Sequence, residues 1–457
     1  MCIAVLRSPG DRPPWMLKLR SSTGFIIATV WMSCFTEFVL YAMIVPVMPT
    51  ALVTRAGVPY EEREYWVSVL LMAESGVALL CCPIFGYLVD ISGTRQPPFL
   101  FGLVLLGASM AIFAAARDVS WFVLARLLQG GATAMVTVGG LALLTDSVEA
   151  EHLGQTIGYT GSAITLGFLL GPLLGGLIYE NLGYTAVFMV AFAVISGDLL
   201  LRVLVIEKQV ASRWTKPTTT TEEETATAHG PSRPGDQFAL IRLVKQPRIL
   251  ISSWALLVHG IIFAAFDSTL PVYVESRYGW NTFGAGMIFL PASISSLFEP
   301  VFGYLSDRYG ARKATFTGFL LLAPSLICLR FTEENSTAHI ALLVTLLVLI
   351  GMFTSLAIPA LYAETQTVLD ELEARDPGIF GPKGATAQAF GIQTMAQFVG
   401  LFAGPVWGGF IDHRFGWKAM SASLGVLAGI TSIPMLWLSD DPENADDDEE
   451  SRRPLLT

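Results

Sequence analysis

The chain has 457 residues, of which 53% are hydrophobic and only 14% are charged, whereas soluble domains carry about 25% charged residues. Twelve mostly apolar stretches lie between Gly24 and Leu438, each near the roughly 20 residues that a bilayer-spanning helix needs. This composition leaves little sequence for a soluble catalytic domain. The net charge of −10 owes much to the tail "DDPENADDDEE", which is typical of a solvated segment and gives no argument for a nucleic-acid partner.

We therefore predict an all-α polytopic membrane protein with twelve transmembrane helices in two six-helix bundles. The expected spans are 24–48, 65–89, 98–116, 120–145, 154–179, 184–206, 249–274, 282–305, 314–331, 339–364, 387–411 and 417–439. The N-terminal segment lacks the apolar core of a signal peptide, so we expect no cleavage. Lys and Arg divide about 20 to 7 between the two sides, which predicts cytoplasmic termini by the positive-inside rule.

Five segments follow from this pattern. They are a cytoplasmic N-terminal tail (1–23), an N-terminal bundle (24–206), a cytoplasmic linker (207–248), a C-terminal bundle (249–439) and an acidic cytoplasmic tail (440–457). The linker is rich in Thr, Pro and Glu, a composition that does not bury a core. On the predicted outer side, "NST" at Asn335 fits a glycosylation acceptor.

Two sequence patterns occur twice. "GYLVDISGTR" (86–95) and "GYLSDRYGAR" (303–312) share six of ten residues, and "GFLLGPLLGG" (167–176) matches "GLFAGPVWGG" (400–409). Each pair falls at the same place in its half, which predicts a parallel repeat with the substrate site between the halves. We expect the first pair to form gating loops, with candidate residues Gly86, Asp90, Gly93, Arg95, Gly303, Asp307, Arg308 and Arg312.

The second pair places glycines at four-residue spacing on one helical face. Such a stripe lets helix backbones approach closely, and each proline removes a backbone donor where the helix can bend. Helix packing alone would explain either stripe, but their duplication favours a mechanical role at the bundle interface. The residues are Gly167, Gly171, Pro172, Gly175 and Gly176, with Gly400, Gly404, Pro405 and Gly408 in the other half.

Three carboxyl groups, Glu37, Glu74 and Asp267, lie well inside expected spans. An ionised group there costs about 2.5–3.5 kcal/mol, so each must be paired, protonated or in contact with water. A Glu37 and Glu74 pair would let proton binding compete with cation binding. Arg126 fits either a structural tie or a proton-site partner, and Asp267 could instead lie near the outer rim.

The other intramembrane polar residues have simpler explanations. Asp198 is placed to pair with Arg202 one turn later. Glu299 and Glu364 are expected near span ends, where their carboxyl groups can reach water. His259 fits a packing role better than a titrating one, and the cysteines lack any ligand spacing.

The repeated motifs resemble those of the major facilitator superfamily, over all twelve spans. "GYLVDISGTR" is similar to the family's loop signature, "RLLQGG" (126–131) to a fourth-span motif associated with proton coupling, and "GFLLGPLLGG" to a fifth-span motif of antiporters. Further stretches, including "FLPASIS" (289–295), resemble the drug:proton antiporters and, within them, the vesicular amine transporters. Glu37 and Asp267 lie where that group has an amine-recognising aspartate and a seventh-span glutamate.

Departures from that group are as informative. Glu74 stands where the resemblance implies a lysine, and Thr354 and Thr394 replace aspartates. The monoamine substrate should therefore not be carried over, and a fungal-type exporter of a drug or secondary metabolite is the nearest resemblance.

We expect a monomeric proton-coupled exporter of a small organic, cationic or amphipathic compound, with no enzyme activity, cofactor, metal or nucleic-acid partner. The alternatives are a uniporter or symporter of a sugar or other nutrient, for which Gln393 and Gln397 are candidates, and a sensor on the same scaffold. We expect residence in the plasma membrane. The alternative is a vacuolar or endosomal membrane, because Leu455 and Leu456 in "EESRRPLLT" resemble a dileucine sorting signal.

Overall fold

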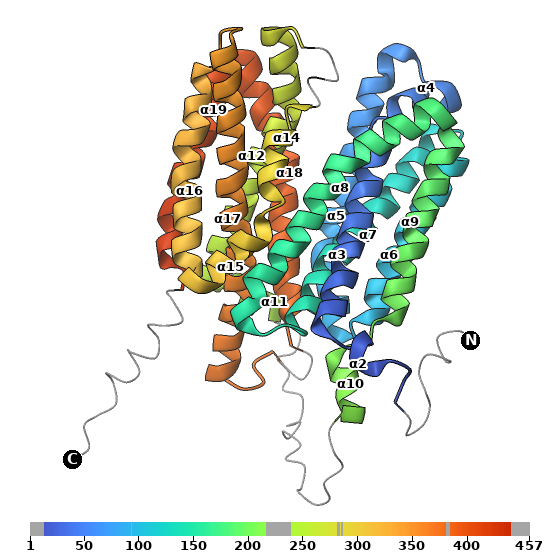
Figure 1. Ribbon diagram of the computed structural model, residues 1–457, viewed down its shortest axis with the longest axis vertical. Coiled ribbons are helices and arrows are strands. Elements are labelled where there is room, and N and C mark those ends of the chain that lie inside the picture. Colours follow the sequence, from blue (N-terminus) through green and yellow to red (C-terminus); the bar gives the residue numbers. More distant parts are fainter. Residues whose placement is uncertain are drawn as a thin grey trace, which may run out of the picture. The chain divides into compact units, whose positions relative to one another are not determined.

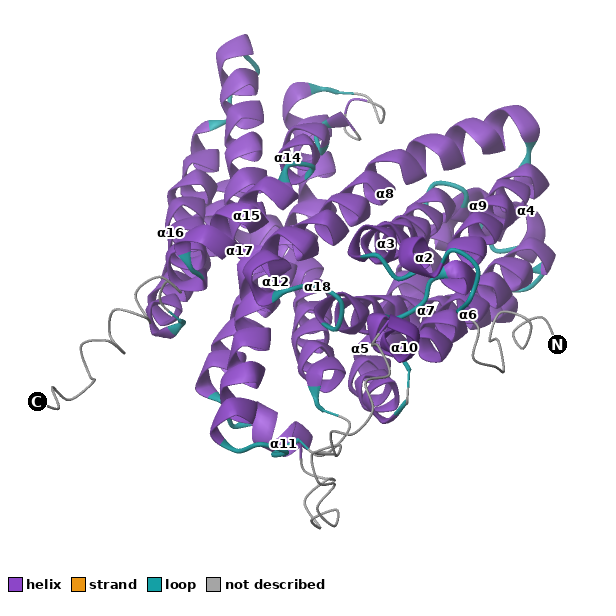
Figure 2. Cartoon of the chain, turned by 60° about the horizontal axis from the view of Figure 1, so that its bottom comes forward, coloured by secondary structure: helices purple, strands orange, loops and turns teal. Residues whose placement is uncertain are grey.

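The computed structural model describes residues 13–92, 94–215, 239–280, 284, 287–380 and 384–439. Within these ranges the regular elements are all helices, with no strand (Figure 2). Among the described residues, eleven helices are long and apolar enough to cross a membrane. The predicted all-α, polytopic class is confirmed.

In the first half of the chain, local sequence signals mark the boundaries of long helices. Ser22 caps α3 by accepting a hydrogen bond from the Phe25 N–H, and Gly183, at φ 81°, separates α8 from α9. The helices are α2 (Leu17–Arg20), α3 (Thr23–Ile44), α4 (Met48–Ala56), α5 (Arg63–Ile91), α6 (Gln96–Ala115), α7 (Val119–Thr145), α8 (Leu153–Leu182), α9 (Tyr184–Leu204) and α10 (Lys208–Thr215).

The second half repeats this order. Gly416, also at φ 81°, separates α18 from α19, as Gly183 separates the corresponding helices of the first half. The helices are α11 (Ala239–Val244), α12 (Pro247–Tyr278), α14 (Leu290–Ser296), α15 (Glu299–Tyr309), α16 (Ala311–Cys328), α17 (Thr337–Arg375), α18 (Thr386–Phe415) and α19 (Trp417–Ser432).

The eighth expected span, 282–305, differs from a single long helix. Its described part contains two short helices, α14 and α15, with a break at Leu297 and Phe298. Pro291 and Pro300 each lie in the first turn of one of these helices, where a missing N–H is tolerated. The two prolines explain why this span forms two short helices.

Residue contacts divide the chain into two compact units. Unit 1 contains the described residues within 1–149, 166–245 and 369–395, and unit 2 those within 150–165, 246–368 and 396–457. In unit 1, α7 packs against α5, α6 and α3, and α9 packs against α6 and α3 (Figure 1). In unit 2, α19 packs against α16 and α12. The predicted bundle boundaries stay a prediction.

Candidate transport and gating sites

A buried ion pair joins α5 to α7 in unit 1. The Nη1 atom of Arg126 lies 2.9 Å from Oε2 of Glu74 and also donates to Oε1 of Gln129 at 2.9 Å. The exposed fractions of Arg126 and Glu74 are 0% and 4%. The two helices come close here because Gly130 has no side chain: a Cβ at this position would overlap the Glu74 carbonyl oxygen. Glu74 is thereby held by a fixed cation.

Glu37 contacts the same helix at a different level. It lies on α3, is fully buried, and accepts a hydrogen bond from Oγ1 of Thr133 at 2.7 Å. Its other oxygen, Oε2, has no hydrogen-bond partner among the described residues. Thr133 follows Arg126 by two helical turns, about 10 Å along α7. The two carboxyl groups therefore contact α7 separately, with only Glu74 held by a cation.

Asp267 belongs to unit 2 and has a different environment. It lies on α12, one turn before Pro271, and its side chain is exposed in the structure. Among the residues that the structure describes, none forms an ion pair or hydrogen bond with its carboxyl group.

Both glycine stripes are close helix contacts. A Cβ added to Gly171 would lie 2.5 Å from the Ala42 Cβ on α3, and one added to Gly167 would lie 2.8 Å from the Val39 nitrogen. A Cβ added to Gly175 would overlap the Met43 carbonyl oxygen. Gly176 faces open space, and Pro172 is exposed. The stripe thus lets α8 pack backbone to backbone against α3.

The second stripe makes the corresponding contact in unit 2. A Cβ on Gly404 would lie 2.7 Å from the Ala264 Cβ of α12, and one on Gly408 would lie 2.9 Å from the Ala265 Cβ. Gly400 would overlap the Leu257 carbonyl, while Pro405 is exposed. Equivalent sequence patterns therefore produce equivalent helix pairs, α8 with α3 and α18 with α12.

The first gating motif contacts the start of a helix that is far away in the sequence. The carboxylate of Asp90 accepts hydrogen bonds from the backbone N–H groups of Ala387 at 3.0 Å and Gln388 at 2.9 Å, in the first turn of α18. Gly86 packs one turn earlier, where a Cβ would lie 2.7 Å from the Ala387 carbonyl oxygen. A carboxylate at a helix N-terminus is favoured by the helix dipole.

The second motif makes the same arrangement in unit 2. Asp307 accepts hydrogen bonds from the N–H groups of Gly154 at 2.7 Å and Gln155 at 2.8 Å, in the first turn of α8. Gly303 packs against the Gly154 carbonyl with no room for a side chain. Each aspartate thus holds the start of a helix that is far away in the sequence.

The arginines of the two motifs differ in their contacts. Arg95 forms ion pairs with Asp90 at 3.1 Å and Asp146 at 2.8 Å. In the second copy, Arg312 donates to the Leu438 carbonyl at 2.8 Å, and Arg308 is exposed near the Tyr309 ring. Gly93 lies outside the described residues.

Three other carboxyl groups have defined partners or positions. The predicted pair of Asp198 and Arg202 is confirmed at 2.9 Å. The expectation that Glu299 and Glu364 reach water was wrong, since they are only 4% and 1% exposed. Glu364 is held by Arg248 at 2.5 Å, whereas Glu299 packs against α8. Position along a span does not determine which way a side chain faces.

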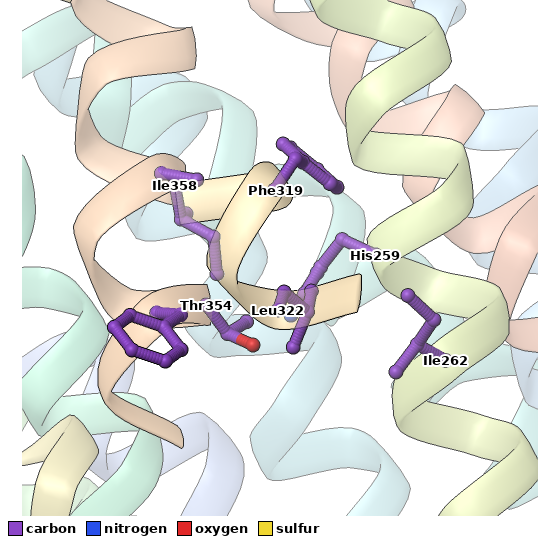
Figure 3. A pocket seen from close by; sticks show the side chains of 8 residues that line it. His259, Ile262, Phe319, Leu322, Thr354 and Ile358 are labelled. Carbon is purple, nitrogen blue, oxygen red and sulfur yellow. The ribbon is translucent and has the colours of Figure 1, made fainter. Parts of the chain in front are cut away.

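A small pocket in unit 2 surrounds His259. Figure 3 shows side chains from α12, α16 and α17 converging there, and the lining residues are His259, Ile262, Phe319, Leu322, Phe353, Thr354, Ala357 and Ile358. His259 Nδ1 lies 3.4 Å from Nε2 of Gln397, whose Oε1 accepts a hydrogen bond from Tyr362 at 3.0 Å. The mostly apolar lining agrees with a packing role for His259.

Outside the spans, Glu207 links the end of α9 to the start of α6. Its carboxylate accepts a hydrogen bond from the Gln96 N–H at 2.8 Å, and its exposed fraction is 8%. Burial raises the pKa of Glu207, and the backbone hydrogen bonds at Arg95 and Gln96 partly offset that rise. Asn335 is exposed and donates to the Tyr278 carbonyl at 3.4 Å; its glycosylation stays a prediction.

Several contact residues were not anticipated from the sequence. Thr133 holds Glu37, Asp146 holds Arg95, and Gly154, Gly158 and Gly161 form a glycine face on the first half of α8. The glycine spacing in "GQTIGYTG" (154–161) could have revealed that face. The other two residues carry no local pattern that marks their partners.

Comparison with known proteins agrees with this architecture. The protein-family model described as Major Facilitator Superfamily matches residues 30–371 and 287–457 of the chain. The MFS-type transporter ppzB of Metarhizium rileyi is 31% identical over 472 residues, which cover 93% of this chain and 96% of that protein. The synaptic vesicular amine transporter of Rattus norvegicus is 25% identical over 380 residues, which cover 81% and 66%.

A solved structure shows the same fold. The crystal structure of the human organic anion transporter MFSD10 (TETRAN) superimposes with a TM-score of 0.68 at 18% identity, and covers 90% of this chain and 99% of that one. The family match extends over most of the chain, and the fungal relative aligns along nearly its whole length. The chain belongs to the major facilitator superfamily of membrane transporters.

Proposed function

We propose that this transporter exports or sequesters a small organic compound, cationic or amphipathic, in exchange for protons by alternating access. One observation carries the proposal: Glu37 is a fully buried carboxyl group with one oxygen that has no partner among the described residues, whereas Glu74, a second buried carboxyl group that contacts α7, is already held by Arg126.

The chemistry follows from the different partners of the two acids. A buried carboxylate without a cation is costly, so Glu37 is stable when it binds either a proton or a positively charged cargo. Both ligands neutralise the same charge, so that each excludes the other. Glu74 has its charge compensated by Arg126 and serves to hold α5 and α7 in place around the site. Asp267 is a further candidate in unit 2.

The gating part of the proposal rests on Asp90 and Asp307. Each carboxylate binds two amide groups at a helix N-terminus, and these contacts must break if the helices separate. We assign them to a latch that stabilises one conformation. The glycine-mediated pairs α3–α8 and α12–α18 would stay intact and move as stiff elements.

The relatives support a transporter of organic compounds without fixing the charge of its cargo. One is named a vesicular amine transporter, while the structural neighbour is described as an organic anion transporter. The acidic groups favour a cation here. We further propose that the protein is a monomer with cytoplasmic termini and that it resides in the plasma membrane. A fluorescent fusion would test this location.

Uptake into proteoliposomes under an imposed pH gradient tests the proposed exchange. We expect accumulation of lipophilic cations that collapses when a protonophore is added. Accumulation that persists unchanged after the protonophore would exclude proton antiport. Uptake of sugars in place of cations would instead favour the nutrient carrier.

A further inference from the structure

Glu299 is a buried acid to which the proposed exchange site gives no role. It is the first residue of α15, and only 4% of it is exposed. Its carboxyl group lies against Gly161 of α8, where an added Cβ would overlap both carboxyl oxygens. One turn along, Gly158 packs on the backbone of Glu299, with its added Cβ 2.6 Å from the carbonyl oxygen. Because Gly158 and Gly161 have no side chains, α8 leaves space for this carboxyl group.

Among the described residues, no charged group compensates Glu299, and no ion pair or hydrogen bond of its carboxyl group is found. The remaining titratable groups on α15, in the first half of α8 and just before α8 are otherwise engaged or exposed. Asp307 binds the amides of Gly154 and Gln155. The exposed groups are Glu151, His152, Tyr159, Tyr304, Arg308 and Tyr309.

Glu299 therefore contrasts with three buried acids of the chain that have a cationic partner. Glu74, Asp198 and Glu364 each have an arginine within 2.9 Å. An uncompensated carboxylate in such a place is far more costly than a neutral acid. The group fits the contact with Gly161 as a neutral carboxylic acid.

We propose that Glu299 is a proton-binding site that controls the packing of α15 on α8. With the proton bound, the carboxyl group packs against Gly161. When the proton leaves, the carboxylate must gain water, and the contact along Gly158 and Gly161 opens. The contact ends at Asp307 and the first turn of α8, so loss of the proton would also weaken that latch. A role of Glu299 in coupled transport rests on the proposed exchange, whereas proton binding at Glu299 does not depend on it.

Infrared spectroscopy of the purified full-length protein, without cargo, tests proton binding directly. We expect the difference between the wild-type and Glu299→Gln spectra at neutral pH to contain the C=O band of a protonated carboxyl group. This band should decrease at alkaline pH. Glu275→Gln, at an exposed position of α12, is the matched control and should remove no such band. A wild-type minus Glu299→Gln difference with carboxylate bands alone would overturn the proposal.

Hydrogen exchange tests the link to packing. In the wild type, exchange of segments 154–161 and 299–307, corrected for the intrinsic effect of pH, should speed up as pH rises. In Glu299→Gln it should not depend on pH, and identical profiles in the two proteins would overturn the control of packing by the proton.

A second variant tests the same site in case Glu299→Gln does not fold. Gly161→Ala should displace the carboxyl group and shift its band, while the same substitution in a Glu299→Ala background should leave the carboxyl region unchanged. An unshifted band in Gly161→Ala would also count against the site. None of these measurements uses cargo, so the Glu299 site and the proposed exchange can fail independently.

Discussion

Asp90 and Asp307 occupy equivalent positions of a repeated motif, and each binds two backbone N–H groups in the first turn of a helix far away in sequence. The four distances lie between 2.7 and 3.0 Å. The repeat thus preserves a specific contact in each half, and that contact is open to direct test.

Replacing Asp307 with Asn should weaken the start of α8. Hydrogen bonds to a charged group contribute about 1.5–3 kcal/mol, so we expect the amides of Gly154 and Gln155 to exchange about tenfold to a hundredfold faster. Asp118→Asn is the control, because Asp118 precedes α7 without making a capping hydrogen bond. Equal exchange in Asp307→Asn and wild type would show that this carboxylate does not hold α8.

Loss of one member of the Glu74 and Arg126 pair should destabilise unit 1. Glu74→Gln leaves Arg126 buried without its counter-charge, a change that costs about 3–5 kcal/mol. The double variant Glu74→Gln/Arg126→Gln should cost less than the sum of the two single changes. Denaturation midpoints in detergent measure this difference.

Glu61→Gln, at an exposed position just before α5, is the control for that series. If Glu74→Gln were as stable as this control, the ion pair would have no structural role. Arg126 would then be left with its other role, that of a proton-site partner.

The glycine stripes predict a strong dependence on position. Gly171→Ala and Gly404→Ala place a methyl group 2.5 and 2.7 Å from an alanine Cβ, and we expect each to lose about 1–3 kcal/mol of stability through overpacking. Gly176→Ala and Gly409→Ala meet open space and should be neutral or stabilising by up to about 1 kcal/mol. Equal thermal stability of the four variants would contradict the close packing.

Glu207 should make stability depend on pH. Its pKa in the folded protein is raised above the ordinary value of 4.5, so the folded state holds this proton at a pH where the unfolded state has lost it. The resulting contribution to stability is present at low pH and is lost as the pH rises through the raised pKa.

Glu207→Gln lacks this titration. The wild-type unfolding midpoint should therefore fall relative to that of Glu207→Gln as the pH rises above 4.5. Glu151→Gln, at an exposed position, should follow the wild type. Parallel profiles of wild type and Glu207→Gln would contradict the raised pKa.

The sequence predicted local features well and long-range contacts poorly. Gly171 and Gly404 were found because a close helix contact requires a small residue at a fixed spacing, which the letters show directly. The partner of Asp90 was missed, because Gln388 is almost 300 residues away and its backbone N–H belongs to no motif. Glu299 was misplaced since hydropathy gives depth along a span and not the direction of a side chain.

The most direct measurement of the central proposal compares wild type with Glu37→Gln in proteoliposomes, with a lipophilic cation as probe. Glutamine keeps a hydrogen-bond acceptor for Thr133 but cannot exchange a proton. We predict that the variant assembles normally and loses accumulation driven by the pH gradient. Accumulation by Glu37→Gln at the wild-type level would contradict the assignment of Glu37 as the coupling site.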